Sequence, residues 1–170
     1  MLPTGHLAAT YILVRAGSAI SQPLSLSETI LVLASGAILD LDLLGSIFLK
    51  KPHHSLLTHT PLAIFLVWTT LVLVFGPDLS LTAKILILAA LLLHLFLDQL
   101  VDWEVQKKWS GLEQAAKINW LYPFKTVRAP LQEKPLIFDP SFYLDYPKKL
   151  KFSVCLETTL ILIAVFLFFK

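Results

Sequence analysis

Long apolar runs constrain this chain more than any other feature of its sequence. Residues 81–100 and 152–169 are nearly unbroken stretches of Leu, Ile, Val, Phe and Ala, each bounded by polar residues. A helix needs ~20 apolar residues to cross a bilayer core about 30 Å thick. Hydrophobic residues make up 56% of the chain and the mean hydropathy is +0.72, which is too apolar for an ordinary soluble domain. The sequence therefore predicts an integral membrane protein.

A third apolar segment, residues 55–75, carries clear signals for the start and end of a helix. Thr60 can cap the N-terminus of this helix, and Pro61 stands at the first helical position, where its missing N–H does no harm. Gly76 and Pro77 follow the last apolar residue and should end the helix.

Two further segments are weaker, because residues 26–39 are short and residues 6–20 are interrupted by Arg15. They could form a hairpin that spans only part of the bilayer. Taken together, the segments predict an all-α fold, an integral membrane helical bundle of four to five short helices. We expect a single membrane domain over residues 1–170.

The composition changes between residues 101 and 151, where charged, aromatic and proline residues replace the apolar runs. This part predicts a cytoplasmic or interfacial segment between the helices of residues 1–100 and a C-terminal transmembrane helix at 152–170. Its first half, 102–117, could form an amphipathic helix whose tryptophans lie at the level of the lipid headgroups.

Alternating crossings would bring the polar residues of the first four segments to one membrane face. The first segment begins at that face, the second ends there, the third begins there and the fourth returns to it. Ionisable groups so close to hydrocarbon cost several kcal/mol unless they are paired, solvated or bound to a metal. The residues gathered at this face are His6, Asp40, Asp42, His53, His54, His59, His94 and Asp98.

The same topology gives the two faces unequal numbers of basic residues. Lys50, Lys51 and the basic residues between 107 and 151 fall on the histidine-bearing face. By the positive-inside rule this face is cytoplasmic, which predicts a multi-pass protein of the cell (inner) membrane with its site facing the cytoplasm. The net charge of +2 is small, so we expect no nucleic-acid partner. The basic residues that fall on the opposite face are Arg15, Lys84 and Lys170.

The spacing of the polar residues favours a metal site. His94 and Asp98 are four residues apart, so they lie on one side of a helix and can offer two ligands to one ion. Asp40 and Asp42 end a helix, and either carboxylate could reach the same point. The alternative for His94 and Asp98 is a structural hydrogen bond between helices.

Histidines from a turn could complete such a site, since His54 and His59 lie just ahead of the predicted helix start at Pro61. The lone cysteine, Cys155, sits in the last apolar run, which excludes a zinc cage of thiolates. Imidazoles and carboxylates suit zinc, manganese or iron(II), and the ligand types alone do not decide among these metals.

The order of these elements has a counterpart in a known family. The chain reads Thr4-Gly5-His6, then Leu39-Asp40-Leu41-Asp42, then His54-Ser55-Leu56-Leu57-Thr58-His59-Thr60, then His94-Leu95-Phe96-Leu97-Asp98. In this order and spacing it resembles the YdjM-like membrane-bound metal-dependent hydrolases over about residues 4–124. Leu39 replaces the usual proline of the family, and Ser55 stands where arginine is common, which leaves that arginine's anion contact without an obvious counterpart.

The family is in turn distantly similar to zinc-dependent phospholipase C and the related single-strand nucleases. That resemblance implies a site for at most two ions, most plausibly zinc, with Asp98 as the bridge between them. It implies His6 as a ligand of one ion. It places on the other ion His94, His54 and one of Asp40 or Asp42.

These features lead to the hypothesis of a metal-dependent hydrolase, of phosphodiesterase or phospholipase type, that acts on phosphate esters at the cytoplasmic face. A site at headgroup level favours a phospholipid substrate, although a soluble phosphodiester remains an alternative. The catalytic candidates are His59 and Asp42, which could orient or deprotonate the attacking water, and Asp98.

Other classes fit less well. A type-2 phosphatidic acid phosphatase shares Gly5-His6 and the His94 to Asp98 spacing, but its Arg-Pro and Ser-Arg pairs do not occur in the sequence. An intramembrane metalloprotease would need His-Glu-x-x-His. A transporter would place its ligands near the membrane midplane rather than at one face. The remaining alternative is a non-catalytic metal-binding scaffold or regulatory protein.

The basic asymmetry predicts that residues 101–151 are cytoplasmic and that the turn at 76–80 lies on the opposite side. Cysteines introduced at Asp78 and Glu133 test this with a membrane-impermeant label on intact cells. We expect labelling at position 78 only, and labelling at position 133 from outside would reverse the topology.

Overall fold

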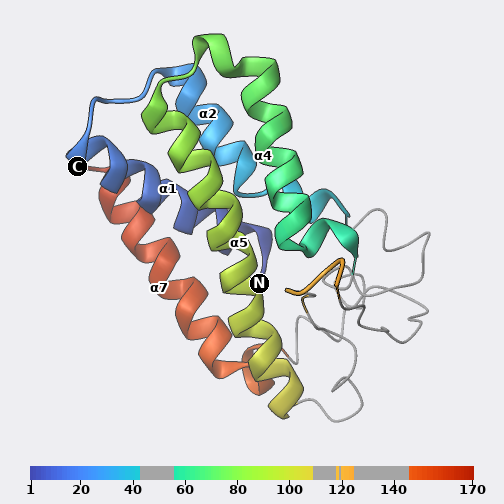
Figure 1. Ribbon diagram of the computed structural model, residues 1–170. Coiled ribbons are helices and arrows are strands. Elements are labelled where there is room, and N and C mark those ends of the chain that lie inside the picture. The colour runs from blue at the N-terminus through green and yellow to red at the C-terminus, as the bar shows by residue number, and fades with distance from the viewer. Residues whose placement is uncertain (43–55, 109–117, 119, 125–145) are drawn as a thin grey trace.

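The computed structural model describes residues 1–42, 56–108, 118, 120–124 and 146–170 (Figure 1). Every regular element in this part of the chain is helical, which confirms the all-α prediction. The longer helices are α1 (Pro3–Ile20), α2 (Leu26–Ser35), α4 (Pro61–Phe75), α5 (Leu81–Lys108) and α7 (Lys151–Phe168). The short 3-10 turns are η1 (Ile38–Leu41), η3 (Leu57–His59) and η4 (Gly76–Asp78).

Local capping explains where two of these helices begin. Thr60 caps α4 as predicted, with its Oγ1 accepting the Ala63 N–H at 3.2 Å, and Pro61 is the first helical residue. Ahead of α2, the Ser25 hydroxyl accepts the Glu28 N–H at 3.2 Å, and the Glu28 carboxylate accepts the Ser25 N–H at 2.8 Å. This reciprocal pair is a capping box, which satisfies two backbone donors that the helix leaves unpaired.

Helix α5 occupies the centre of the bundle, where it packs against α1, α2, α4 and α7. Figure 1 shows it between α7 on one side and α4 on the other. The helix does not end at Leu100 as expected but runs on to Lys108, so the first residues of the predicted interfacial segment extend it. Its sequence contains no Gly or Pro to stop it. Asp102 and Glu104 are buried against neighbouring elements rather than solvated.

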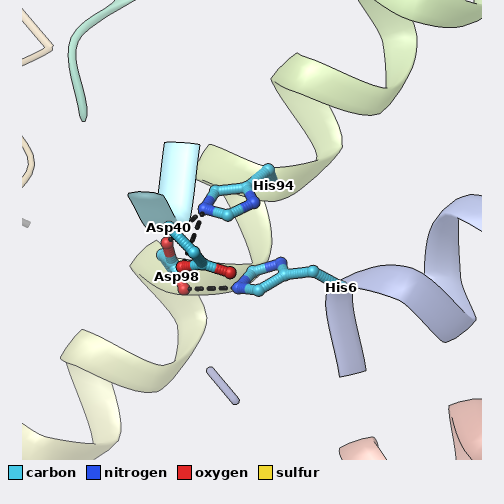
Figure 2. Close-up of side chains that lie close together, drawn as sticks. All are labelled: His6, Asp40, His94 and Asp98. Atoms are coloured by element: carbon cyan, nitrogen blue, oxygen red, sulfur yellow. Dashed lines mark hydrogen bonds and ion pairs between the residues drawn. The ribbon is translucent and has the colours of Figure 1, made fainter. Parts of the chain in front are cut away.

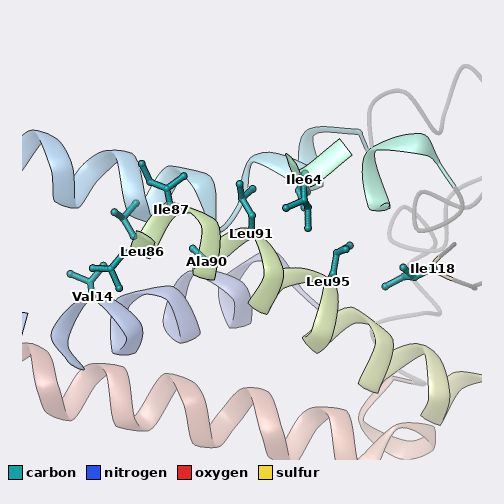
Figure 3. Packing of buried hydrophobic residues seen from close by; sticks show 10 residues of the cluster. Val14, Ile64, Leu86, Ile87, Ala90, Leu91, Leu95 and Ile118 are labelled. Carbon is teal, nitrogen blue, oxygen red and sulfur yellow. The ribbon is translucent and has the colours of Figure 1, made fainter. Parts of the chain in front are cut away.

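One side of α5 forms the middle of the apolar core (Figure 3). Its buried residues follow the three- and four-residue spacing of a single helix face. Side chains of α1, α2 and α4 close over this face, which fixes the three helices around α5. The core residues are Val14, Val32, Leu39, Ile64, Leu86, Ile87, Ala90, Leu91, Leu95 and Ile118.

Three helical stretches are long and apolar enough to cross a membrane: Pro61–Asp78, Leu81–Val105 and Lys151–Phe168. The outer faces of α4 and α7 expose large apolar side chains, including Phe65 and Phe166. Such extensive apolar exposure is uncommon in a water-soluble monomer and is what lipid solvation requires. The membrane prediction is therefore supported by the fold as well as by composition.

The core predicts a contrast between two adjacent leucines of α5. Leu91 is fully buried, whereas 43% of Leu92 is exposed. Leu91→Ala should destabilise the protein by ~2–5 kcal/mol, because it removes buried methyl groups and leaves a cavity. Leu92→Ala should change the stability by no more than ~0.5 kcal/mol. Melting in detergent measures both, and equal effects would contradict this packing.

Candidate metal centre

Four ionisable side chains from three segments meet beside helix α5 (Figure 2). His6 comes from the first turn of α1, Asp40 from η1, and His94 and Asp98 from successive turns of α5. Each offers one ligand atom, and these atoms all lie within 4.8 Å of one another. His6, His94 and Asp98 are at most 1% exposed. The cluster has the composition and spacing to hold a metal ion.

Asp98 is shared by all the histidines around it. Its Oδ1 lies 2.9 Å from His6 Nε2 and 2.7 Å from the α-amino nitrogen of Met1. Its Oδ2 lies 3.1 Å from His94 Nε2 and 3.4 Å from His59 Nε2. The two oxygens therefore face different partners, as a carboxylate bridging two positive centres would.

The ring of His94 is held by a backbone carbonyl. Its Nδ1 lies 2.8 Å from the Gly36 oxygen, and a carbonyl can only accept, so Nδ1 carries the proton. In the neutral ring this leaves Nε2 as a lone-pair donor directed at Asp40 and Asp98. The His6 ring stacks on the His94 ring with centroids 3.7 Å apart, so both imidazoles approach the carboxylates from the same side.

Several polar atoms in the cluster are buried without a satisfactory partner. Asp40 Oδ2 and His6 Nδ1 have no hydrogen bond among the described residues, and His94 Nε2 has only ion-pair contacts with Asp40 and Asp98. Leaving a buried polar atom unpaired costs about 1–3 kcal/mol, and more if it is charged. A bound cation would satisfy the carboxylates and His94 Nε2 together, so the residues present fit a metal.

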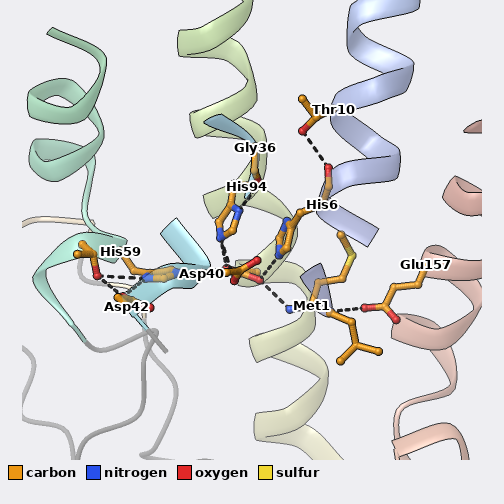
Figure 4. A network of polar contacts seen from close by, with 12 residues as sticks. Met1, His6, Thr10, Gly36, Asp40, Asp42, His59, His94 and Glu157 are labelled. Atoms are coloured by element: carbon orange, nitrogen blue, oxygen red, sulfur yellow. Dashed lines mark hydrogen bonds and ion pairs between the residues drawn. The ribbon is translucent and has the colours of Figure 1, made fainter. Parts of the chain in front are cut away.

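A second polar group adjoins the cluster from η3 (Figure 4). His59 Nδ1 lies 2.8 Å from Asp42 Oδ2, and the hydroxyl of Thr58 also hydrogen-bonds to this oxygen. The carboxylate of Asp42 thus orients the ring and directs Nε2 towards Asp98. Histidines that bind metals commonly have their other ring nitrogen hydrogen-bonded to a carboxylate in this way.

Two residues at this site have raised pKa values in the metal-free protein. Burial lowers the pKa of His59, but the hydrogen bonds and charges of Asp42 and Asp98 outweigh it and raise the pKa to about 9. Burial raises the pKa of Asp40. A metal ion bound here would have to displace the proton that this shift favours on His59.

The sequence-predicted residues are distributed over these two groups. The structure brings His6, Asp40, His94 and Asp98 together and places His59 beside them. Asp42 is one step further out, in contact with His59 rather than within the group of four. His54, predicted as a ligand, lies outside the described residues, as does His53.

Two groups at the site were missed by sequence reasoning. The Gly36 carbonyl positions His94, and the Met1 amino group contacts Asp98. Both are backbone groups, which no side-chain pattern reveals. The nearest available signal was the glycine itself, which stands between a helix and the predicted ligand Asp40.

The fold and the cluster define a class: a helical, multi-pass membrane protein with a buried His/Asp group that could hold a metal ion. The particular family follows from comparison, because the family model described as "YdjM inner membrane protein" matches residues 1–169. The chain belongs to this family. Neither the curated proteins nor the solved structures contain a significant match.

Gly36 offers a test of how the site is supported. A Cβ at this position would overlap Thr10 Oγ1 and lie 2.8 Å from Thr10 Cβ, so Gly36→Ala must shift either the backbone that binds His94 or Thr10 of α1. We expect a destabilisation of ~1–3 kcal/mol together with weaker metal binding. The measurements are detergent melting and metal content after reconstitution.

Gly76→Ala is the matched control, because its Cβ would meet only Val72 Cγ1 at an ordinary 3.6 Å. It should leave metal binding unchanged. If Gly36→Ala melts at the wild-type temperature and binds as much metal as wild type, the close approach of Gly36 to Thr10 does not support the site.

Proposed function

We propose that this protein is a metal-dependent hydrolase of phosphate esters, with its site facing the cytoplasm. The observation that carries the proposal is the convergence of His6, Asp40, His94 and Asp98 within 4.8 Å, from segments far apart in the chain. Two imidazoles and two carboxylates suit zinc, manganese or iron(II). Among these we propose zinc, because the family resembles zinc-dependent hydrolases.

The positions of the ligand atoms suggest how one or two ions would be held. Asp40, His94 and one oxygen of Asp98 form one set, and His6 with the other oxygen of Asp98 begins a second. A metal ion bound here would lower the pKa of a coordinated water towards neutrality and polarise phosphoryl oxygens.

His59 is the residue best placed to handle a proton. Its Nδ1 is held by Asp42 and its Nε2 faces the cluster, so Nε2 can orient the attacking water or take up its proton. Asp42 stabilises the ring when it is positively charged, and Thr58 fixes Asp42 in turn. Asp98 contributes by offsetting the repulsion between cations.

A lipid substrate is favoured by the aromatic residues at the same end of α5. Trp103 and Trp120 are both about half exposed, and Trp120 Nε1 donates to Gln99 Oε1 at 2.8 Å, next to Asp98 in the chain. Tryptophans of this kind gather where lipid headgroups meet the hydrocarbon. We therefore expect the phosphate ester of a phospholipid, with a soluble phosphodiester as the competing result.

One observation favours a second candidate, a non-catalytic metal-binding scaffold. The side chains of His6, His94 and Asp98 are almost fully buried, and a structural metal site needs no access for substrate. The two functions differ in turnover, since both require metal but only the hydrolase consumes a phosphate ester.

Asp98→Asn tests the proposal most directly. The amide keeps the shape of the side chain but removes the charge that would join the cations. Metal affinity should fall by more than the ~10–100-fold typical of losing an outer-shell partner, and hydrolysis of a short-chain phospholipid should fall with it. Metal analysis and turnover of the reconstituted protein are the measurements, with detergent melting to monitor folding.

Asp78→Asn is the control, because it makes the same change on an exposed turn at the other end of α4. It should retain metal and turnover. If wild-type protein binds no metal, or if Asp98→Asn keeps both properties, the hydrolase proposal is wrong. Metal binding without turnover on any phosphate ester would support the scaffold.

A further inference from the structure

Helix α7 carries a buried carboxylate that the proposed chemistry does not use. Glu157 is 6% exposed, although most of the helix faces outward, and Ser153 is its other buried residue. A carboxylate within a membrane-crossing helix is costly and is retained where it has partners or a function. Its surroundings therefore indicate what this residue does.

Glu157 binds the chain just ahead of α1. Its Oε1 accepts the Leu2 N–H at 2.6 Å and the Tyr146 hydroxyl at 3.0 Å. The carbonyl of Leu2 in turn accepts the N–H groups of Gly5 at 2.9 Å and His6 at 3.4 Å. The same peptide segment thus contacts α7 on one side and begins α1 on the other.

The first turn of α1 sits closely on this carboxylate. A Cβ at Gly5 would lie 3.1 Å from Glu157 Cγ and 2.9 Å from Met1 Cε, both tighter than ordinary contacts. A larger residue at position 5 would therefore have to displace Met1 or Glu157. The first turn of α1 and helix α7 are thus in close contact at this point.

Two of the groups that reach Asp98 come from this turn and from the residues just ahead of it (Figure 4). The Met1 amino nitrogen and His6 Nε2 lie 2.7 Å and 2.9 Å from the same oxygen, Asp98 Oδ1. A shift of the turn would change both contacts at once, whereas the His94 side of the cluster is held separately through Gly36.

We propose that Glu157 is a positioning residue of the metal centre, which holds the first turn of α1 so that His6 reaches Asp98. The inference rests on the proposed function in so far as the centre binds metal. It makes α7 part of the site, although that helix contributes no residue to the ligand cluster. Tyr146 takes part by fixing the same carboxylate oxygen.

The competing explanation is that Glu157 merely fastens α7 to the bundle. Glu104 provides the comparison, since this buried carboxylate of α5 accepts N–H groups from Phe152 and Ser153 at 3.0 and 2.7 Å. It also fastens α7, but to α5 rather than to the start of α1. A fastening role predicts lower stability with unchanged metal affinity for both residues.

Cobalt(II) titration of the full chain in detergent separates the two explanations, because the visible absorption of Co²⁺ reports its ligands. Glu157→Ala should raise the Kd for Co²⁺ by ~10–100-fold and alter the absorption bands. Glu157→Gln should stay within a few-fold of wild type, because its amide oxygen can still accept the Leu2 N–H. Glu104→Ala should melt earlier but keep the wild-type Kd and spectrum.

The outcomes distinguish this inference from the proposed function. If Glu157→Ala has the same Kd for Co²⁺ and the same absorption bands as wild type, the positioning role is wrong and the metal centre is unaffected. Absence of Co²⁺ binding by wild type would overturn both. If Glu157→Ala does not fold, Tyr146→Phe replaces it as the test. The positioning role predicts a smaller rise in the Kd for Co²⁺ in Tyr146→Phe. An unchanged Kd and an unchanged spectrum would contradict the role.

Discussion

The carboxylate of Asp98 has no exposed surface, and its charge must be balanced inside the protein. An isolated buried carboxylate would cost several kcal/mol, so every element around it has to supply a donor or a cation. Helix α1 supplies His6, Met1 just ahead of it supplies its amino group, and η3 supplies His59. The placement of these elements against α5 therefore follows from one charge as much as from apolar packing.

Helix α5 has two parts with different surroundings. From Leu86 to Leu91 its buried side is apolar and carries the core, and from His94 onward the buried positions also include Asp98, Asp102 and Glu104. The polar residues of the second part bind neighbouring backbone and side chains. This explains why the helix continues beyond the apolar run that the sequence makes visible.

Much of this arrangement could be predicted because it depends on periodicity and capping. The i, i+4 spacing of His94 and Asp98 and the Thr60–Pro61 start of α4 are local properties, and counting crossings was sufficient to bring His6 to the same end as Asp98. The choice between Asp40 and Asp42 was not predictable. Successive residues of a 3-10 turn point about 120° apart, so only the actual orientation of η1 decides which carboxylate faces His94. Glu157 accepts the backbone N–H of Leu2, just ahead of α1, and a contact of this kind leaves no trace in residue spacing.

The polar end of α5 also has a consequence for biosynthesis. A helix that carries Asp98, Asp102 and Glu104 near one end enters the bilayer poorly by itself, because each charge placed in hydrocarbon is unfavourable. The groups from α1 and η3 that contact Asp98 precede it in the chain, whereas α7, which supplies the partners of Glu104, is made afterwards. We expect α5 to settle in the membrane only beside the earlier helices, and to reach its final depth once the end of the chain has been translated.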